Sequence, residues 1–150
     1  MTKEERIEKA VSFFKEGYNC SQSVVAAYAD LYGFTREQAL HMAASFGGGI
    51  GRMRETCGAA CGMFLLAGLE RCAVEGSDRE GKGANYALVQ ELAARFKEKT
   101  GSIRCADLLG LTSKDRIVST PYGSVLCQAS LCGNGAAGSN DLGRFPGKRA

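Results

Sequence analysis

The sequence lacks the features that mark several common classes of protein. It has no apolar run of the roughly 20 residues that a membrane-spanning helix needs. The charge-free stretch near its middle, residues 56–69, is bounded by Glu55 and Glu70 and is too short. Runs of lysine or arginine are also missing, and a net charge of +3 is too small to indicate a nucleic-acid partner. We therefore expect a soluble protein that binds neither membrane nor nucleic acid.

Strand patterns are missing as well, since apolar and polar residues almost never alternate along the chain. Apolar residues recur instead every three or four positions, which predicts an all-α fold, a compact bundle of about five to six helices. A chain of 150 residues is long enough to bury one core without disulfides. We expect a helical domain over residues 3–114 and an irregular, poorly ordered, glycine-rich tail over residues 115–150, which holds both prolines, Pro121 and Pro146.

Helix boundaries follow from capping residues and from glycines. Two helices are expected to begin with capping boxes, Asn19 with Gln22 and Thr35 with Gln38. Residues 76–83 are polar and predict a break between helices. The segments expected to be helical are 3–16, 19–33, 35–46, 56–74, 85–99 and 102–109. The residues expected to face inward in the first of these are Ile7, Ala10, Val11 and Phe14, and in the fifth Tyr86, Val89, Ala93 and Phe96.

Histidine is nearly absent, whereas cysteine occurs seven times. The charged N-terminus shows no apolar leader, so we expect a cytoplasmic protein whose thiols are reduced and serve metal or redox chemistry. Cys20 follows Asn19, and Cys57 follows a glycine-rich run, so both are expected to begin helices. Unpaired N–H groups and the helix dipole at such positions favour thiolate over thiol. The one histidine, His41, falls on the polar side of its helix and is expected to be exposed.

Three segments carry a resemblance to a known family: Asn19–Val24, Phe46–Gly62 with its glycine loop and Cys-Gly-Ala-x-x-Gly motif, and Lys97–Gly110. They resemble the C_GCAxxG_C_C family of redox-active proteins over about residues 3–114. The family is a small all-helical domain, and a similar segment of split-Soret cytochrome c associates its cysteines with an iron–sulfur cluster. The resemblance implies that Cys20, Cys57 and Cys105 bind such a cluster. It implies a fourth ligand from the tail, either Cys127, which lies nearer the expected distance from Cys105, or Cys132.

Cluster chemistry is also consistent with the residues around these cysteines. Glycine lets backbone amides approach an inorganic sulfide closely, and N–H groups near sulfur tune its potential. The glycines expected to approach the cofactor are Gly47, Gly48, Gly49, Gly51 and Gly58. Arg52 and Arg54 are expected to offset the negative charge of a cluster. Gly62 and Gly68 are expected to let another helix or the cofactor come close.

Other functions remain open at this level. Zinc is disfavoured because the chain has no C-x-x-C pair. A thiol–disulfide enzyme would use Cys57 as its catalytic nucleophile, resolved by Cys61, Cys20 or Cys105. A third possibility is a helical interaction protein with structural cysteines, and Cys61 and Cys72 are interpreted as packing residues. Each redox function requires a redox partner protein of unknown identity, and apolar faces on several short helices are compatible with a homodimer.

Overall fold

The structure is a computed structural model that describes residues 1–72 and 74–110. In these residues the chain is helical and contains no strand, which confirms the all-α prediction. The helices are α1 (Lys3–Lys15), α2 (Cys20–Tyr28), α3 (Arg36–Ala43), α4 (Gly47–Ile50), α5 (Gly58–Glu70), α6 (Arg79–Thr100) and α7 (Cys105–Leu109), with short 3-10 turns η1 (Ala29–Tyr32) and η2 (Ala44–Phe46). No helix in the described stretches is long and apolar enough to cross a membrane. The expected tail and the domain boundary at 114 lie outside the described residues.

Both predicted capping boxes are confirmed. The Asn19 side chain accepts from the Gln22 N–H at 2.9 Å, and the Gln22 side chain accepts from the Asn19 N–H at 3.1 Å. Thr35 and Gln38 make the same reciprocal pair at the start of α3. Each box satisfies backbone donors that a helix start otherwise leaves unpaired, so the positions where α2 and α3 begin are set locally by the sequence.

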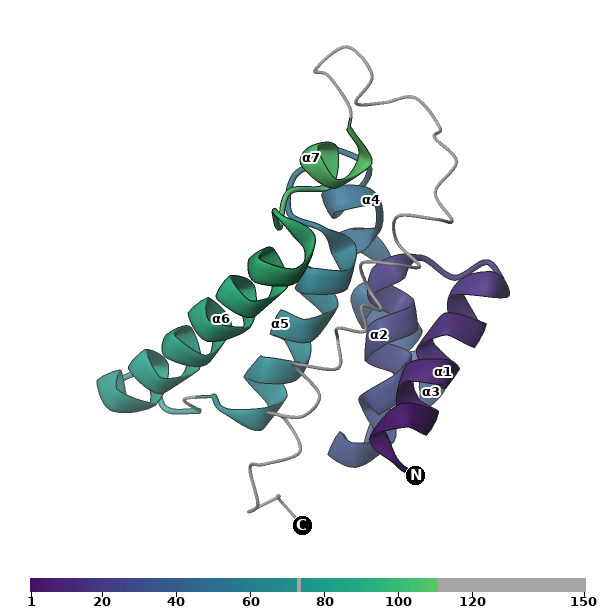
Figure 1. Cartoon of the computed structure of the whole chain (residues 1–150). Helices are drawn as coiled ribbons and strands as arrows, with labels where there is room; N and C mark the ends of the chain where they lie inside the picture. Colours follow the sequence, from purple (N-terminus) through teal and green to yellow (C-terminus); the bar gives the residue numbers. More distant parts are fainter. Residues whose placement is uncertain (73, 111–150) are drawn as a thin grey trace.

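Helix α2 lies at the centre of the bundle. It packs against α1, α3 and α5, and eight of its nine residues are buried. Figure 1 shows α1 and α2 side by side and α5 beside α6, with α4 and α7 at the end where α5 begins. The start of α2 is directed to this same end (Figure 1), so several helix beginnings gather there.

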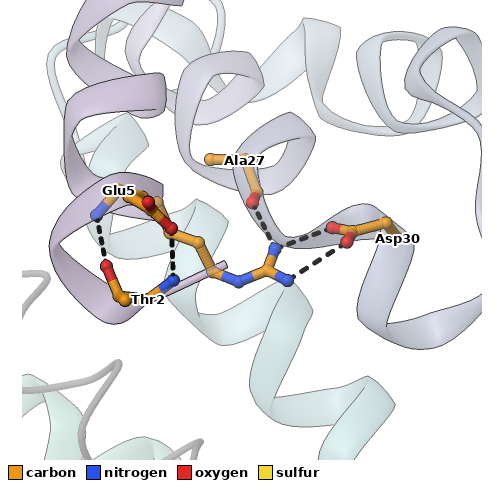
Figure 2. Close-up of polar contacts among 5 residues, drawn as sticks. Thr2, Glu5, Ala27 and Asp30 are labelled. Carbon is orange, nitrogen blue, oxygen red and sulfur yellow. Dashed lines mark hydrogen bonds and ion pairs between the residues drawn. The ribbon is translucent and has the colours of Figure 1, made fainter.

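The inner face of α1 is turned by about one residue from the predicted one. Its buried residues are Arg6, Ala10 and Phe13, while Ile7, Val11 and Phe14 are only partly buried. The reason is that the Arg6 guanidinium finds acceptors at the end of α2. Its Nη1 donates to the Ala27 carbonyl at 2.9 Å and to Asp30 Oδ1 at 2.7 Å, and Nη2 donates to Asp30 Oδ2 at 3.1 Å (Figure 2). A buried arginine with these acceptors ties α1 to the end of α2.

Replacing Asp30 with asparagine should therefore destabilise the protein. The Asp30→Asn change removes the charge that faces the buried guanidinium, and we expect the free energy of unfolding to fall by about 1–2 kcal/mol, because half of the Asp30 side chain is exposed. Urea denaturation measures the difference. Glu16→Gln, which weakens the exposed pair of Arg36 and Glu16, is the matched control and should change stability by no more than about 0.5 kcal/mol. Equal losses in the two variants would contradict the role given to the Arg6 pair.

Helices α5 and α6 depart from their predicted limits. Helix α5 covers Gly58–Glu70, shorter at both ends than the predicted 56–74. Helix α6 begins at Arg79, inside the segment expected to be a polar break, because the Asp78 side chain caps it by accepting from the Gly81 N–H at 2.8 Å. The predicted inner face of α6 is also wrong at Tyr86, which is 61 % exposed. The buried residues of α6 are Leu88, Leu92 and Phe96, one residue every fourth position. This narrower stripe suffices because α6 packs mainly against the single helix α5.

Candidate cysteine site

Three of the four predicted ligands come together in the described residues. Cys20 is the first residue of α2, Cys57 is the N-cap of α5, and Cys105 is the first residue of α7. Their side chains are almost completely buried, with exposed fractions of 1 %, 0 % and 2 %. Each thiol lies within electrostatic range of the other two. Thus sulfur atoms from three distant segments share one buried site, and Cys127 and Cys132 lie outside the described residues.

Backbone pairing between residues 54–57 and 103–106 holds Cys57 beside Cys105. The Cys57 N–H donates to the Ile103 carbonyl at 2.6 Å, and the Cys105 N–H donates to the Glu55 carbonyl at 2.6 Å. Thr56 and Arg104 form the isolated antiparallel bridge between these bonds. Because hydrogen bonds from both cysteine N–H groups fix the two segments, the position of one cysteine determines that of the other.

Glycine at position 58 brings Cys20 to the same place. A methyl group at residue 58 would overlap the Cys20 sulfur and lie 2.7 Å from the Phe46 carbonyl oxygen. The first turn of α5 therefore lies directly against the start of α2, with no side chain between them. This contact makes Cys20 a neighbour of Cys57, which precedes Gly58 in the chain.

The glycine loop has an unusual left-handed backbone. Gly48, Gly49, Ile50, Gly51 and Arg52 all have φ between 59° and 72°, and Arg54 has φ 62°. L-residues other than glycine disfavour this region, for isoleucine above all because it is branched at Cβ. The turn is held by hydrogen bonds from the N–H groups of residues 52, 54 and 55 to the carbonyls of residues 47, 48 and 49. Strain of this kind concentrates at functional sites, where the surrounding structure enforces it.

The predicted cofactor glycines mainly allow protein segments to approach one another. A Cβ at Gly49 would lie 2.5 Å from the Cys105 Cβ, and one at Gly47 would overlap the Asn19 side chain. The Gly48 backbone lies near enough to the Cys20 sulfur to act against the rise that burial causes in the pKa of Cys20. Gly51 supplies a left-handed position with no close neighbour. That these residues also approach a cofactor stays a prediction.

The two arginines of the loop have different environments. Arg54 is completely buried, and its Nη1 donates to the Cys105 sulfur at 3.8 Å. Its backbone N–H donates to the Gly48 carbonyl at 3.3 Å, and its carbonyl accepts from the Ala106 N–H at 3.2 Å. Arg52 is exposed. The structure therefore places one positive charge, that of Arg54, inside the cysteine site, as the sequence suggested, and leaves Arg52 at the surface.

The expected ionisation of the cysteines is wrong in direction. Burial raises the pKa of Cys57 to about 12, although the N–H groups of Ala59 and Ala60 lower it. Burial likewise raises the pKa of Cys20 against hydrogen bonds from Gly48 and Ser21, and that of Cys105 against the Arg54 guanidinium. The helix-start donors are present, as predicted. Removal of the sulfur atoms from water has the larger effect, because it penalises the charged form.

The remaining predicted residues lie in different surroundings. Cys61 is buried, one turn after Cys57, and its thiol donates to the Thr56 carbonyl at 3.8 Å. Cys72 is exposed and stands apart from the site, so its interpretation as a packing residue is wrong. His41 is exposed, with 80 % of its side chain accessible, as expected. Within residues 1–72 and 74–110, no three His, Cys, Asp or Glu side chains are arranged to hold a metal ion.

Comparison with known proteins identifies one match. Residues 18–140 match the model of the family described as "Putative redox-active protein (C_GCAxxG_C_C)". No curated protein and no solved structure matches the chain. The matched range includes the three converging cysteines and extends over Cys127 and Cys132.

Proposed function

The chain belongs to the C_GCAxxG_C_C family of redox-active proteins, and from this membership we propose that it binds an iron–sulfur cluster for electron transfer or redox sensing. Cys20, Cys57 and Cys105 are three of the ligands. Cys127, whose spacing from Cys105 is nearer to that expected of the family than the spacing of Cys132, is the fourth. The observation that carries the proposal is the convergence of three buried cysteines from α2, α5 and α7.

The residues of the site fit a cluster in their chemistry. Iron–sulfur clusters are held by cysteine sulfur, and a [4Fe–4S] cluster takes four cysteines, one at each iron. Its ligands therefore lie farther apart than those of a single ion. The described residues contain no group of three such side chains already arranged to hold a metal ion, so the fit rests on the kind of donor and not on a preformed geometry. When bound, the cluster supplies one-electron redox chemistry. The protein supplies sulfur ligands, N–H donors and a dry environment.

Each residue around the sulfurs has a definable task. Burial raises the pKa of Cys20 and Cys57, and the nearby backbone N–H groups of Gly48 for Cys20 and of Ala59 and Ala60 for Cys57 act against it. Such donors stabilise negative charge on sulfur and so favour the reduced state. The Arg54 guanidinium, 3.8 Å from the Cys105 sulfur, acts in the same direction. Ligand cysteines must lose their protons on binding, so burial makes cluster loading dependent on pH.

The alternative of a thiol–disulfide enzyme with Cys57 as nucleophile has less support. Cys57 has no exposed surface, and burial raises its pKa to about 12, so the thiolate that would attack a substrate is rare at neutral pH. A role for the cysteines in packing alone does not call for the hydrogen bond from the Arg54 guanidinium to the Cys105 sulfur. We therefore place cluster binding first.

Anaerobic purification followed by iron and sulfide analysis tests the proposal. The protein should be brown and contain iron and acid-labile sulfide. The variants Cys20→Ser, Cys57→Ser and Cys105→Ser should each lose most of the iron. Cys72→Ser is the matched control, since its thiol is exposed and away from the site, and it should keep the full content. Comparison of Cys127→Ser with Cys132→Ser identifies the fourth ligand by the same measurement.

Helical circular dichroism must accompany these measurements, because a buried serine can unfold the chain. A folded wild-type protein that stays colourless and free of iron after reconstitution with iron and sulfide would contradict the proposal. Iron retained at wild-type level in all three folded serine variants would contradict it as well.

A further inference from the structure

A fourth buried thiol, that of Cys61, lies next to the proposed ligands without being one of them. Its residue is 7 % exposed, and its sulfur lies within electrostatic range of Cys20. Cys61 stands at a variable position of the Cys-Gly-Ala-x-x-Gly motif, so the motif itself does not require a thiol there. What this thiol does must follow from its surroundings.

The interface between α2 and α5 is unusually close at this point. Positions 58, 61 and 62 lie on one face of α5, because residues three and four apart are neighbours on a helix. A Cβ at Gly58 would overlap the Cys20 sulfur, and a Cβ at Gly62 would lie 3.0 Å from the Val24 Cβ and 3.2 Å from the Ser21 carbonyl oxygen. The face of α5 that carries Cys61 is thus pressed against the face of α2 that carries Cys20.

From this contact we propose that Cys20 and Cys61 form a reversible disulfide across the α2–α5 interface when no cluster is bound. Disulfides need Cα atoms within about 7 Å, and two glycines at the crossing permit that approach. The pairing itself does not depend on the proposed cluster. Its consequence rests on the proposed function, since a Cys20 held in a disulfide cannot serve as a ligand. The site would then have two exclusive states, one loaded and one oxidised.

The other two cysteines are engaged elsewhere. The Cys105 sulfur accepts from Arg54, which directs it toward the glycine loop. Cys57 and Cys61 are four residues apart at the start of one helix, and the N–H of Cys57 is bound to Ile103. Cys61 lies one turn after Gly58, the residue that the Cys20 sulfur covers, and its thiol donates to the Thr56 carbonyl in the same turn. Cys57 is also within electrostatic range of Cys20, so the Cys57→Ser and Cys61→Ser variants decide which of the two pairs with Cys20.

The reaction balances with a small disulfide as oxidant. Two S–H bonds break and one S–S bond forms between Cys20 and Cys61. The two electrons and two protons reduce glutathione disulfide to two molecules of glutathione, through a mixed disulfide. Exchange with reduced glutathione reverses the step. Because both thiols are buried, like Cys57, exchange requires transient opening of the α2–α5 contact, and oxidation should be far slower than that of an exposed thiol or of a catalytic one.

Peptide mapping tests the pairing in the metal-free protein carrying Cys72→Ser, Cys127→Ser and Cys132→Ser. Trypsin releases Cys20 in peptide 16–36, Cys57 and Cys61 together in peptide 55–71, and Cys105 in peptide 105–114. After incubation with glutathione disulfide we expect peptides 16–36 and 55–71 to be linked, with the loss of two hydrogens. The link should persist in a further Cys57→Ser variant and be lost in Cys61→Ser and Cys61→Ala, with helicity of each reduced variant checked first.

Three results would overturn the pairing: no linked peptide, a link of 16–36 to 105–114, or a link that survives Cys61→Ser and is lost in Cys57→Ser. Iron analysis of the reduced protein is a separate measurement. A protein that forms the disulfide and never takes up iron would contradict the cluster and leave the pairing intact. A protein that takes up iron but forms no linked peptide would contradict the pairing and leave the cluster proposal intact.

Discussion

Replacing Gly58 with alanine should be among the most damaging single changes in the chain. The added methyl group would overlap the Cys20 sulfur and press on the Phe46 carbonyl oxygen, and one of its neighbours, Gly47, has no side chain that can move aside. Overpacking of a tight interior contact costs about 1–3 kcal/mol, and we expect the free energy of unfolding to fall by about 2–3 kcal/mol. Chemical denaturation of the metal-free protein measures this loss.

Gly68 in the same helix offers a matched control. A Cβ there would meet no atom within 4 Å, so Gly68→Ala should gain helix propensity and raise stability by about 0.5–1 kcal/mol. The two substitutions have the same chemistry and opposite expected signs. If Gly58→Ala were neutral or stabilising, the close contact between α2 and α5 would be wrong. Gly58→Ala should also lower the iron content of the protein, whereas Gly68→Ala should leave it unchanged.

Raising the pH should strongly destabilise the metal-free protein. Burial raises the pKa of Cys57 from 9.0 to about 12 and that of Cys61 from 9.0 to about 11. The folded state therefore holds these protons more tightly than the unfolded state. Their contribution to stability is fully present below about pH 9 and is lost as the pH rises toward 12. A pKa unit corresponds to about 1.4 kcal/mol, so Cys57 alone should remove about 2–3 kcal/mol between pH 8 and pH 11.

Urea denaturation of the wild-type protein and of Cys57→Ala at several pH values isolates this effect. The variant has a lower stability at pH 8, because it loses a buried side chain, but its stability should fall less steeply above pH 9. All other titratable groups are the same in both proteins, so their contributions cancel in the comparison. Parallel pH profiles for the two proteins would show that the Cys57 sulfur is solvated.

The sequence predicted where a helix begins when residues close together in the chain determine that position. The capping boxes that begin α2 and α3 are satisfied by residues three positions apart, so no distant contact is needed to recognise them. The same rule would have identified Thr2 and Glu5 at the start of α1. The early start of α6 was missed because the polar composition of residues 76–83 suggested a break, although Asp78 within them is a good capping residue.

Properties set by the tertiary structure could not be read in this way. Arg6 and Arg54 are charged, and acceptors far away in the chain accompany their burial, Ala27 and Asp30 for Arg6 and Cys105 among those of Arg54. The left-handed conformation of Ile50 contradicts its own preference and is imposed by its neighbours. The pKa of Cys57 was misjudged for a related reason, because its position at a helix start is visible in the sequence and its depth below the surface is not.

The pairing of residues 54–57 with 103–106 sets an order of events during synthesis. Helices α1, α2 and α5 can form while translation continues, but the partner of Cys57 is made nearly fifty codons later, when Ile103 and Cys105 leave the ribosome. A nascent polypeptide that has reached only α6 contains Cys20 and Cys57 but not Cys105, and it cannot form the backbone bridge between Thr56 and Arg104. Assembly of the proposed cluster could therefore begin only after α7 has been made, and would be complete only once Cys127 has followed it.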